Sequence, residues 1–447
     1  MADQLLTLAG RKWNGVAYTG GAVVQLNSSG TWVERTSGGF VAWNLNEFTF
    51  SDGSTVFFYI QSSNFETAAQ RPYAGTLYRS NDLGIIWTNV TPSSGLSEFV
   101  NDIAQDADKN LWLLTDERED NGIGTANKPS RIYKSTDKGA TWTLKYTSII
   151  SSFDRHPGMF NITCHPTDSS KILVETAEVI GWGSRITRSV DGGATWTVIT
   201  PTIPDPPTNP KNTGATQQSV FNYTSTGAIV WAGSFETAVD DLFVLRSIDD
   251  GTTWTLQYTE AAVTAHGTGF VEANVVVYVA ATNFLFSLTP AVGIVTKIAN
   301  INTSPFSTSN VMHGISRHAV SGVSTLLLGC GSDTSPGTDS SIFTRPADLS
   351  SDWAIHAQAG NMSADLGYVL YVARLGIIGA TPSPTPETLR PPQEQGPPAA
   401  PSGGDPGAAF PPTGIGRMRR ERLARKQQRE QRTQQGKQLR RIPSQAR

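Results

Sequence analysis

Residues able to do chemistry gather in a few stretches of this chain without forming a recognisable catalytic motif. The side chains that could contact a glycan or a protein through charge, hydrogen bonds or stacking are Arg71, Tyr73, Glu117, Arg118, Arg155 and His156. Solvated charges are the normal content of surface loops, so a structural interpretation is favoured over a functional one for each residue. We therefore treat all six as candidate binding residues and assign no catalytic residue.

The richest run of possible metal ligands is Asp-Glu-Arg-Glu-Asp at residues 116–120. Its carboxylates could hold calcium, but their spacing is not that of an EF-hand loop. The six histidines are scattered, and the chain has no H-E-x-x-H, G-x-S-x-G or phosphate-cradling glycine loop. The sequence predicts no metal site and no cofactor.

The elements that would position these residues are marked by four copies of the pattern Ser-x-Asp-x-Gly-x-x-Trp. The serines stand at 80, 135, 189 and 247, at intervals of 55, 54 and 58 residues, which indicates an array of one supersecondary unit. Each copy joins two short strands as a hairpin turn: Asp accepts hydrogen bonds from turn amides, Gly allows positive φ, and Trp packs on the next sheet. The structural residues are Ser80, Asp82, Gly84, Trp87, Ser135, Asp137, Gly139, Trp142, Ser189, Asp191, Gly193, Trp196, Ser247, Asp249, Gly251 and Trp254.

The pattern S-x-D-x-G-x-T-W resembles the Asp-box (BNR-type) repeat of sialidases, xyloglucanases, sortilin-type receptors and photosystem II assembly factors. The second, third and fourth copies match in full, whereas the first has Ile86 in place of Thr. Those families are β-propellers. The resemblance therefore implies an all-β propeller.

Degenerate copies at 26–32, around Ser287 and at 342–345 bring the count to about seven four-stranded blades within residues 1–380. Six is the alternative, because the Ser287 copy lacks both Asp and Trp. We expect residues 367–372 to close the ring by pairing with a strand around 16–18, which would remove exposed edges. The working surface is expected to carry the long loops 61–75, 115–130, 151–158, 201–218 and 331–340, opposite the turns of the repeat.

The sialidase resemblance would imply an arginine triad, a Tyr/Glu nucleophile pair and an Asp acid/base. No N-terminal Arg motif of that family is present, and Arg79, Arg188 and Arg246 stand directly before their repeat turns. A xyloglucanase-like enzyme would need two facing Asp residues that sequence alone does not locate. An enzyme is therefore the lesser hypothesis.

Charge divides the chain into an acidic body and a basic end. Residues 417–447 hold 12 Lys or Arg against 2 Asp or Glu, a local net charge of +10 that leaves −13 on the rest of a chain whose total is −3. A Pro/Gly-rich linker at 381–416 precedes this tail, which has too few apolar residues for a core and is expected to order on a partner. The docking residues would be Arg419, Arg420, Arg422, Arg425 and Lys426.

Three features of the sequence bear on where the protein is expected to be located. Cys164 and Cys330 form no C-x-x-C pair and are expected to be buried thiols, although one long-range bridge stays open. The N-terminus lacks the pattern of a Sec signal, and no apolar run is long enough to cross a bilayer. The expected location is a virion, or the cytoplasm before assembly.

Three functions follow from these observations. The first is a non-catalytic structural or interaction protein, similar in design to propellers of bacteriophage tails: a virion component such as a tail, nozzle or fibre-attachment protein. The second is a glycan-binding module or glycosidase of sialidase-like fold. The third is non-specific nucleic-acid binding by the basic tail, whose residues 417–447 lack aromatic side chains for stacking.

Overall fold

The computed structural model describes residues 4–13, 21–27, 29, 31–38, 41–62, 75–92, 98–117, 129–148, 159–177, 184–199, 220–235, 241–260, 267–273, 276–281, 284–289, 294–300, 311–320, 323–331, 341–346, 351–352, 354–358 and 369–378. Contacts divide the chain into one unit over Met1–Thr385 and another over Pro386–Arg447. All described residues belong to the first unit.

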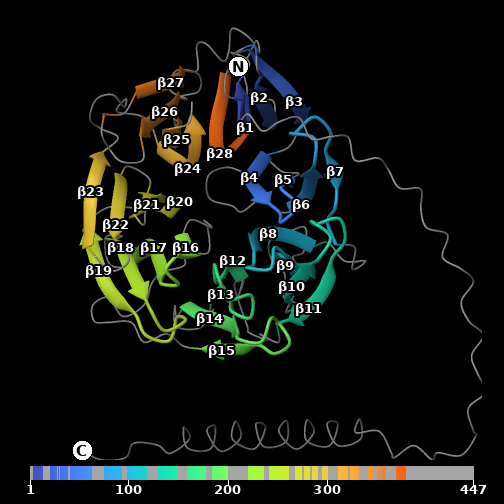
Figure 1. Ribbon diagram of the computed structural model, residues 1–447, viewed down its shortest axis with the longest axis vertical. Coiled ribbons are helices and arrows are strands. Elements are labelled where there is room, and N and C mark those ends of the chain that lie inside the picture. The colour runs from blue at the N-terminus through green and yellow to red at the C-terminus, as the bar shows by residue number, and fades with distance from the viewer. Residues whose placement is uncertain are drawn as a thin grey trace, which may run out of the picture. The chain divides into compact units, whose positions relative to one another are not determined.

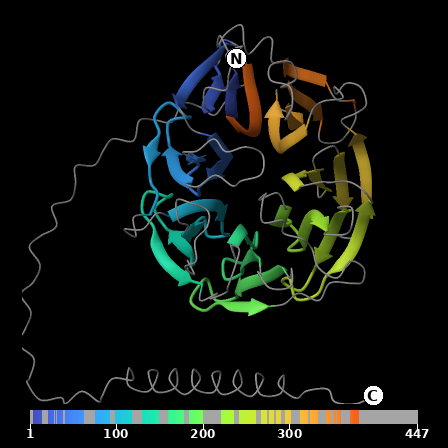
Figure 2. The ribbon, with the colours of Figure 1, turned by 180° about the vertical axis from the view of Figure 1, so that it is seen from behind.

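The described residues form seven four-stranded antiparallel sheets, each a blade of a β-propeller, arranged as a ring (Figures 1 and 2). The predicted fold class is confirmed. The described residues form seven blades, as the main prediction gave, and not the alternative number of six. Blade 1 consists, from the inner to the outer edge, of β28 (Val369–Ile378), β1 (Gln4–Trp13), β2 (Gly21–Leu26) and β3 (Trp32–Gly38). Blade 2 consists of β4 (Val41–Thr49), β5 (Thr55–Ser62), β6 (Gly75–Ser80) and β7 (Thr88–Asn89).

The next three blades carry the other full copies of the repeat. Blade 3 consists of β8 (Glu98–Gln105), β9 (Leu111–Glu117), β10 (Ser130–Ser135) and β11 (Thr143–Thr147). Blade 4 consists of β12 (Met159–Cys164), β13 (Ile172–Ala177), β14 (Ser184–Ser189) and β15 (Thr197–Ile199). Blade 5 consists of β16 (Val220–Tyr223), β17 (Ile229–Phe235), β18 (Asp241–Ser247) and β19 (Thr255–Glu260).

The last two blades carry only degenerate copies. Blade 6 consists of β20 (Gly267–Ala273), β21 (Val276–Ala281), β22 (Phe284–Thr289) and β23 (Ile294–Asn300). Blade 7 consists of β24 (Val311–Val320), β25 (Val323–Gly331), β26 (Ser341–Pro346) and β27 (Ala354–Gln358). Ser287 lies in β22 and residues 342–345 lie in β26, the third strand of each sheet, as the phase of the repeat predicted.

The ring closes within blade 1, where β28 pairs with β1 in a register running from Gln4 opposite Ile378 to Trp13 opposite Val369. The closing strand was predicted, but its expected partner at 16–18 was wrong. β1 pairs on one side with β28 and on the other with β2, so residues 14–20 are the connection between β1 and β2. That connection lies outside the described residues.

Strand alternation sends the connections to two opposite faces. We call the face with the first-to-second and third-to-fourth strand turns the box face, and the face with the second-to-third and blade-to-blade connections the loop face. The strand bounds assign all five predicted long loops to the loop face, because each follows a second or a fourth strand. The four repeat turns, 80–87, 135–142, 189–196 and 247–254, lie on the box face; we call them box turns.

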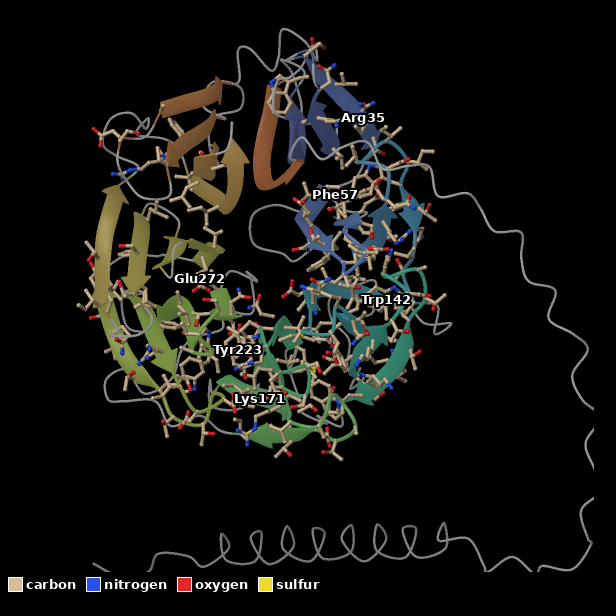
Figure 3. All side chains as sticks on the ribbon, in the orientation of Figure 1. Arg35, Phe57, Trp142, Lys171, Tyr223 and Glu272 are labelled. Atoms are coloured by element: carbon tan, nitrogen blue, oxygen red, sulfur yellow. The ribbon has the colours of Figure 1, made fainter. Side chains whose placement is uncertain are left out.

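The core lies between neighbouring blades. Trp142 of blade 3 packs on a cluster that includes Phe58 and Val56 of blade 2, and Trp254 of blade 5 belongs to a cluster with Leu173 and Ile186 of blade 4. Each box tryptophan therefore joins its sheet to the preceding one, and the prediction that it packs on the next sheet was wrong. Figure 3 shows side chains filling the space between the sheets of blades 2 to 5.

The box glycines are required by both backbone and packing. Gly139, Gly193 and Gly251 have φ of 78°, 84° and 79°. A β-carbon on Gly193 would come within 2.4 Å of the Trp112 ring, and one on Gly139 within 2.4 Å of the Phe58 ring. Phe58 and Trp112 lie on the second strands of the preceding blades, so the glycine lets one blade approach the other.

Cys164 is a free, buried thiol at the end of β12, and burial raises its pKa well above the usual value. It is therefore a poor nucleophile near neutral pH. Cys330 lies in β25, and its side chain is outside the described part of the chain. Among the described residues there is no helix long and apolar enough to cross a membrane.

Candidate functional site

The carboxylate of each box turn is bound within its own turn. In blade 3 the Ser135 hydroxyl donates to Asp137 Oδ1 at 2.7 Å, and Thr141 donates to the same carboxylate through its amide at 2.9 Å and its hydroxyl at 2.5 Å. The Gly139 amide donates to the Ser135 hydroxyl at 2.8 Å. The blade 4 and blade 5 turns repeat this arrangement.

Two turns depart from this hydrogen-bond pattern, and the backbone donors to the third residue are kept in both. Ile86 in the blade 2 turn has no hydroxyl, so only its amide donates to Asp82, at 2.9 Å and 3.1 Å to the two carboxylate oxygens. In blade 1, Asn27 takes the place of the aspartate and accepts from the Ser29 and Thr31 amides at 3.0 Å and 2.9 Å. The degenerate copy at 26–32 therefore keeps the geometry of the turn without the charge.

In the turns of blades 3, 4 and 5 these hydrogen bonds favour the ionised form of the aspartate. Donation from the Thr195 side chain and amide lowers the pKa of Asp191 to about 2. Burial works against ionisation at Asp137 and Asp249, but the threonine and serine donors outweigh it and lower the pKa of both. A carboxylate with a low pKa and filled acceptor sites is a poor general acid or base near neutral pH.

Basic residues before the box turns connect one blade to the next. Arg79 Nε of blade 2 donates to the Lys138 carbonyl in the blade 3 turn at 2.8 Å, and Arg188 of blade 4 reaches the Asp250 carbonyl and Thr252 hydroxyl in the blade 5 turn at 3.4 Å and 3.1 Å. The assignment of these two arginines to the repeat is consistent with these contacts. For Arg246, the buried Nε has no hydrogen-bond partner within the described ranges, which omit residues 290–293 of the next blade.

The fourth residue of the blade 2, blade 3 and blade 5 box turns faces the seam with the preceding blade, whereas Gly192 of the blade 4 turn donates its amide to the Ser170 carbonyl of its own blade. These residues, Leu83, Lys138, Gly192 and Asp250, all have left-handed backbones, with φ from 54° to 69°. Lys138 Nζ lies 2.6 Å from Asp52 of blade 2, whereas Asp250 Oδ2 lies 2.9 Å from Lys171 Nζ of blade 4. The fourth residue of the turn is therefore a cation at the seam between blades 2 and 3 and an anion at the seam between blades 4 and 5.

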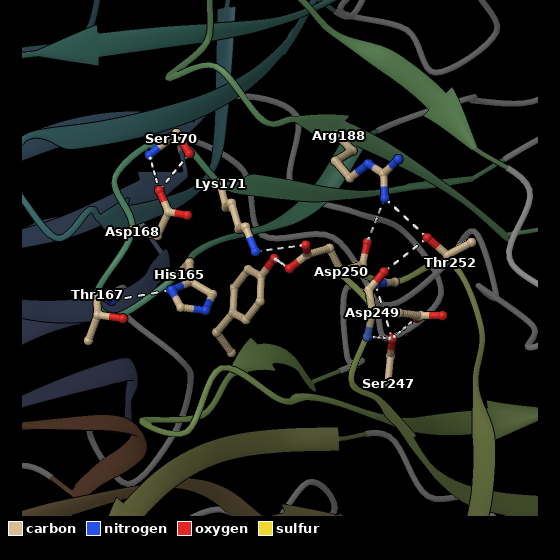
Figure 4. Close-up of polar contacts among 12 residues, drawn as sticks. His165, Thr167, Asp168, Ser170, Lys171, Arg188, Ser247, Asp249, Asp250 and Thr252 are labelled. Carbon is tan, nitrogen blue, oxygen red and sulfur yellow. Dashed lines mark hydrogen bonds and ion pairs between the residues drawn. The ribbon is translucent and has the colours of Figure 1, made fainter.

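Titratable side chains from both blades meet at the seam between blades 4 and 5 (Figures 3 and 4). The Tyr223 hydroxyl donates to Asp250 Oδ1 at 3.0 Å, and Lys171 binds the other oxygen of that carboxylate. His165 packs edge-on against Tyr223 with 5.0 Å between ring centroids, and its Nδ1 accepts from the Thr167 amide at 3.3 Å. We call His165, Lys171, Tyr223 and Asp250 the seam cluster.

The seam cluster is poorly suited to catalysis. Burial, followed by the charge of Asp250, raises the pKa of the Tyr223 hydroxyl well above its usual range. The Asp250 carboxylate is neutralised by Lys171, and the imidazole nitrogen that would act as a base already accepts a backbone proton donor. The cluster holds two blades together.

The loop face ends of blades 3 and 4 carry buried polar groups. Asn101 Nδ2 donates to the Met159 carbonyl at 2.7 Å across the seam between these blades. Glu175 in β13 is 1% exposed and accepts from Asn161 Nδ2 at 2.6 Å. Glu175 is therefore a buried carboxylate near the loop face, a type of group that could serve acid/base chemistry.

Of the predicted binding residues, only the backbone of Glu117 is described: it ends β9 at the loop face, directly opposite Glu98 of β8. Arg71, Tyr73, Arg118, Arg155 and His156 lie outside the described residues, as do Arg419, Arg420, Arg422, Arg425 and Lys426. The sequence interpretation passed over the seam cluster and Glu175. The fourth position of the box turn was the available signal for Asp250, whereas nothing in the local sequence marks Glu175.

Among the described residues, no group of three or more His, Cys, Asp or Glu side chains is placed to hold a metal ion. No family model matches the chain, and no curated protein matches it.

Solved structures give distant likenesses. A protein of unknown function from Dyadobacter fermentans DSM 18053 is 15% identical, with a TM-score of 0.45 over 68% of this chain and 93% of that one. The α-L-arabinofuranosidase Arb93A of Fusarium graminearum, in complex with an iminosugar inhibitor, is 10% identical, with a TM-score of 0.43 over 65% and 88%. YCF48 bound to D1 peptide is 12% identical, with a TM-score of 0.41 over 70% and 84%.

Proposed function

We propose that this chain is a non-catalytic interaction scaffold of the Asp-box propeller type that presents its loop face to a partner. The observation that carries the proposal is that the polar groups of the box face are used in internal contacts, while the long loops belong to the other face. The box carboxylates are bound within their turns, and the seam cluster joins two blades. The long connections all emerge on the opposite face.

We further propose that the scaffold is a virion component, such as a phage tail, nozzle or fibre-attachment protein, and that the basic tail docks it on the assembly. The support is the design of the sequence: a propeller with satisfied box turns, a Pro-rich linker at 381–416 and a tail of net charge +10 at 417–447. A basic segment with few apolar residues can gain order on an acidic partner surface.

Fractionation of particles tests this proposal. The full chain and a variant ending at residue 416 are expressed alongside the particle genes, and particles are purified by density. The full chain should remain with the particles and the truncated chain should be lost. A full chain that never leaves the free-protein fraction would contradict the virion proposal.

A glycan-binding or glycosidase function is the second candidate. It is favoured by the buried Glu175 and by the facing strand positions of Glu98 and Glu117 at the loop face, since glycoside hydrolysis uses two carboxyl groups. Incubation with sialosides and β-glucans distinguishes the candidates. Turnover that disappears in Glu175→Gln or Glu117→Gln, but persists in the box-face variant Asp52→Asn, would replace the scaffold proposal by an enzyme.

A further inference from the structure

We propose that the seam between blades 4 and 5 is an acid-sensitive latch, in which protonation of His165 loosens the contact between the two blades on the box face. This inference is independent of the proposed function. It rests on where the imidazole lies, on what its two nitrogens face and on the charges around it.

His165 is built into the seam rather than lying on the surface. It begins the turn between β12 and β13, which is closed by hydrogen bonds from the His165 amide to the Lys171 carbonyl at 3.0 Å and from the Lys171 amide to the Asp168 carbonyl at 3.1 Å. Its ring packs edge-on against Tyr223 of blade 5. On the other side its Nε2 meets Gly227, where an added β-carbon would be only 2.6 Å from that nitrogen.

The hydrogen bonds of the ring require the neutral imidazole. Nδ1 accepts from the Thr167 amide, so this nitrogen carries no proton. A second proton on the ring would have to occupy Nδ1 and turn an acceptor into a donor facing another donor. The Thr167 bond would then be lost and the ring would be pushed from its place between Tyr223 and Gly227.

The surrounding charges shift the pKa of His165 in opposite directions. Burial, followed by the charge of Lys171, lowers the pKa of His165, while Asp250 on the blade 5 turn and Asp168 on its own turn act to raise it. The other titratable groups near the seam are Tyr223 on β16, Cys164 at the end of β12 and Arg188 on β14. Because Asp250 is held by Lys171 and Tyr223, it is not free to take a charged imidazole as its partner.

The sign of the pH effect follows from this depressed pKa. The closed seam binds fewer protons than the open one between the ordinary histidine pKa of about 6.5 and the lower value in the closed seam. The latch is therefore fully effective above about pH 6.5 and weakens as the pH falls toward the lower value. Within that window the open fraction rises by up to about tenfold per pH unit.

Position 173 provides the probe, because the buried Leu173 side chain packs with Trp254 in this seam, whereas Cys164 packs with Trp112 and Ile132 of blade 3. In the full chain carrying Cys164→Ala, Cys330→Ala and Leu173→Cys, the new cysteine is the single thiol, and a dithiodipyridine reagent labels it from about pH 8 to about pH 4.5. Rates are divided by those of an unstructured peptide thiol, so that the pH dependence of the thiol itself cancels. The corrected rate should rise several-fold below about pH 6.5, at temperatures where the far-ultraviolet circular dichroism is unchanged.

Two variants and one control make the test specific. His165→Asn keeps an oxygen in place of Nδ1 as an acceptor but does not titrate, so its labelling rate should be flat across the acid range. Lys171→Gln removes the cation beside the ring and should move the acid transition to higher pH. His318→Asn, in β24 of blade 7, should behave like the parent.

A flat labelling profile in the parent would overturn the latch, as would an acid response that persists in His165→Asn. A response that disappears equally in His318→Asn would also overturn it, because the titrating group would then not be specific to this seam. If His165→Asn does not fold, the direction of the shift in Lys171→Gln decides: an unchanged or lowered midpoint refutes the proposal.

Discussion

Two adjacent glycines in the blade 4 box turn allow backbone strain to be separated from packing between blades. Gly192 and Gly193 have φ of 69° and 84°, so both occupy a region that L-amino acids avoid. Their surroundings differ. A β-carbon on Gly192 would meet only the Ser169 carbonyl at 3.9 Å, whereas one on Gly193 would meet the Trp112 ring at 2.4 Å and 2.8 Å.

The free-energy costs follow from these distances. Gly192→Ala should cost the left-handed backbone penalty of about 1–2 kcal/mol. Gly193→Ala carries the same penalty plus that of overpacking against a fully buried ring, about 1–3 kcal/mol, so its total should be about 2–5 kcal/mol. The ring has little room to retreat, because it packs on Trp196 at 6.1 Å between centroids and its indole nitrogen donates to Asp106 at 2.9 Å.

Urea unfolding followed by tryptophan fluorescence measures both costs as changes in the free energy of unfolding. A double-mutant cycle with Trp112→Leu adds a sharper test, since Leu173 stands at the equivalent place opposite Gly251. The smaller side chain should relieve the clash, so the double variant should lose less stability than the two single variants together. Equal costs for Gly192→Ala and Gly193→Ala, or additive costs in the cycle, would refute the packing argument.

Four further outcomes are expected. Ile86→Thr should raise the free energy of unfolding by about 0.5–1.5 kcal/mol in urea titration, because it supplies the hydroxyl donor that the other box turns have and removes a side chain that is 66% exposed. Asp52→Lys and Lys138→Asp should each lower the urea midpoint of unfolding slightly, and the charge-reversed double variant should recover most of that loss, since the blade 4–5 seam already uses the reversed order. The free energy of unfolding should fall as the pH drops below about 4 and continue to fall toward about 2, because Asp137, Asp191 and Asp249 have lower pKa values folded than unfolded; Asp191→Asn should flatten this slope in acid titrations. Deletion of 366–380 removes β28 and should lower the thermal unfolding midpoint; an unchanged midpoint would contradict closure by that strand.

The fold could be predicted from the repeat because the hydrogen bonds that form each box turn join residues of that same turn. Ser135, Asp137 and Gly139 satisfy one another locally, so the same residues in the same order specify the same hairpin wherever they recur. Spacing then gave the blade period, and even the weak copy at Asn27 follows it. Such short-range hydrogen bonds are the part of a structure that sequence expresses most directly.

Contacts between blades were less accessible because they join residues far apart in the chain. Nothing near Lys171 in sequence indicates that Asp250 binds it, and the pairing of β28 with β1 instead of residues 16–18 depended on the register of a whole sheet. The packing of Trp142 on blade 2 rather than blade 4 likewise depends on the direction in which the ring is wound. Five of the six candidate binding residues lie outside the described ranges, so that prediction stands untested.

The pairing of β28 with β1 also has a consequence for synthesis on the ribosome. β1, β2 and β3 are made well before β28, yet their sheet lacks its inner strand until β28 has been translated. For most of that time β1 exposes an unpaired edge, which is a template for pairing with other chains. Release of the nascent chain before residue 378 would leave the edge of β1 without its partner strand. Protection of β1 from pairing with other chains therefore depends on complete synthesis of β28.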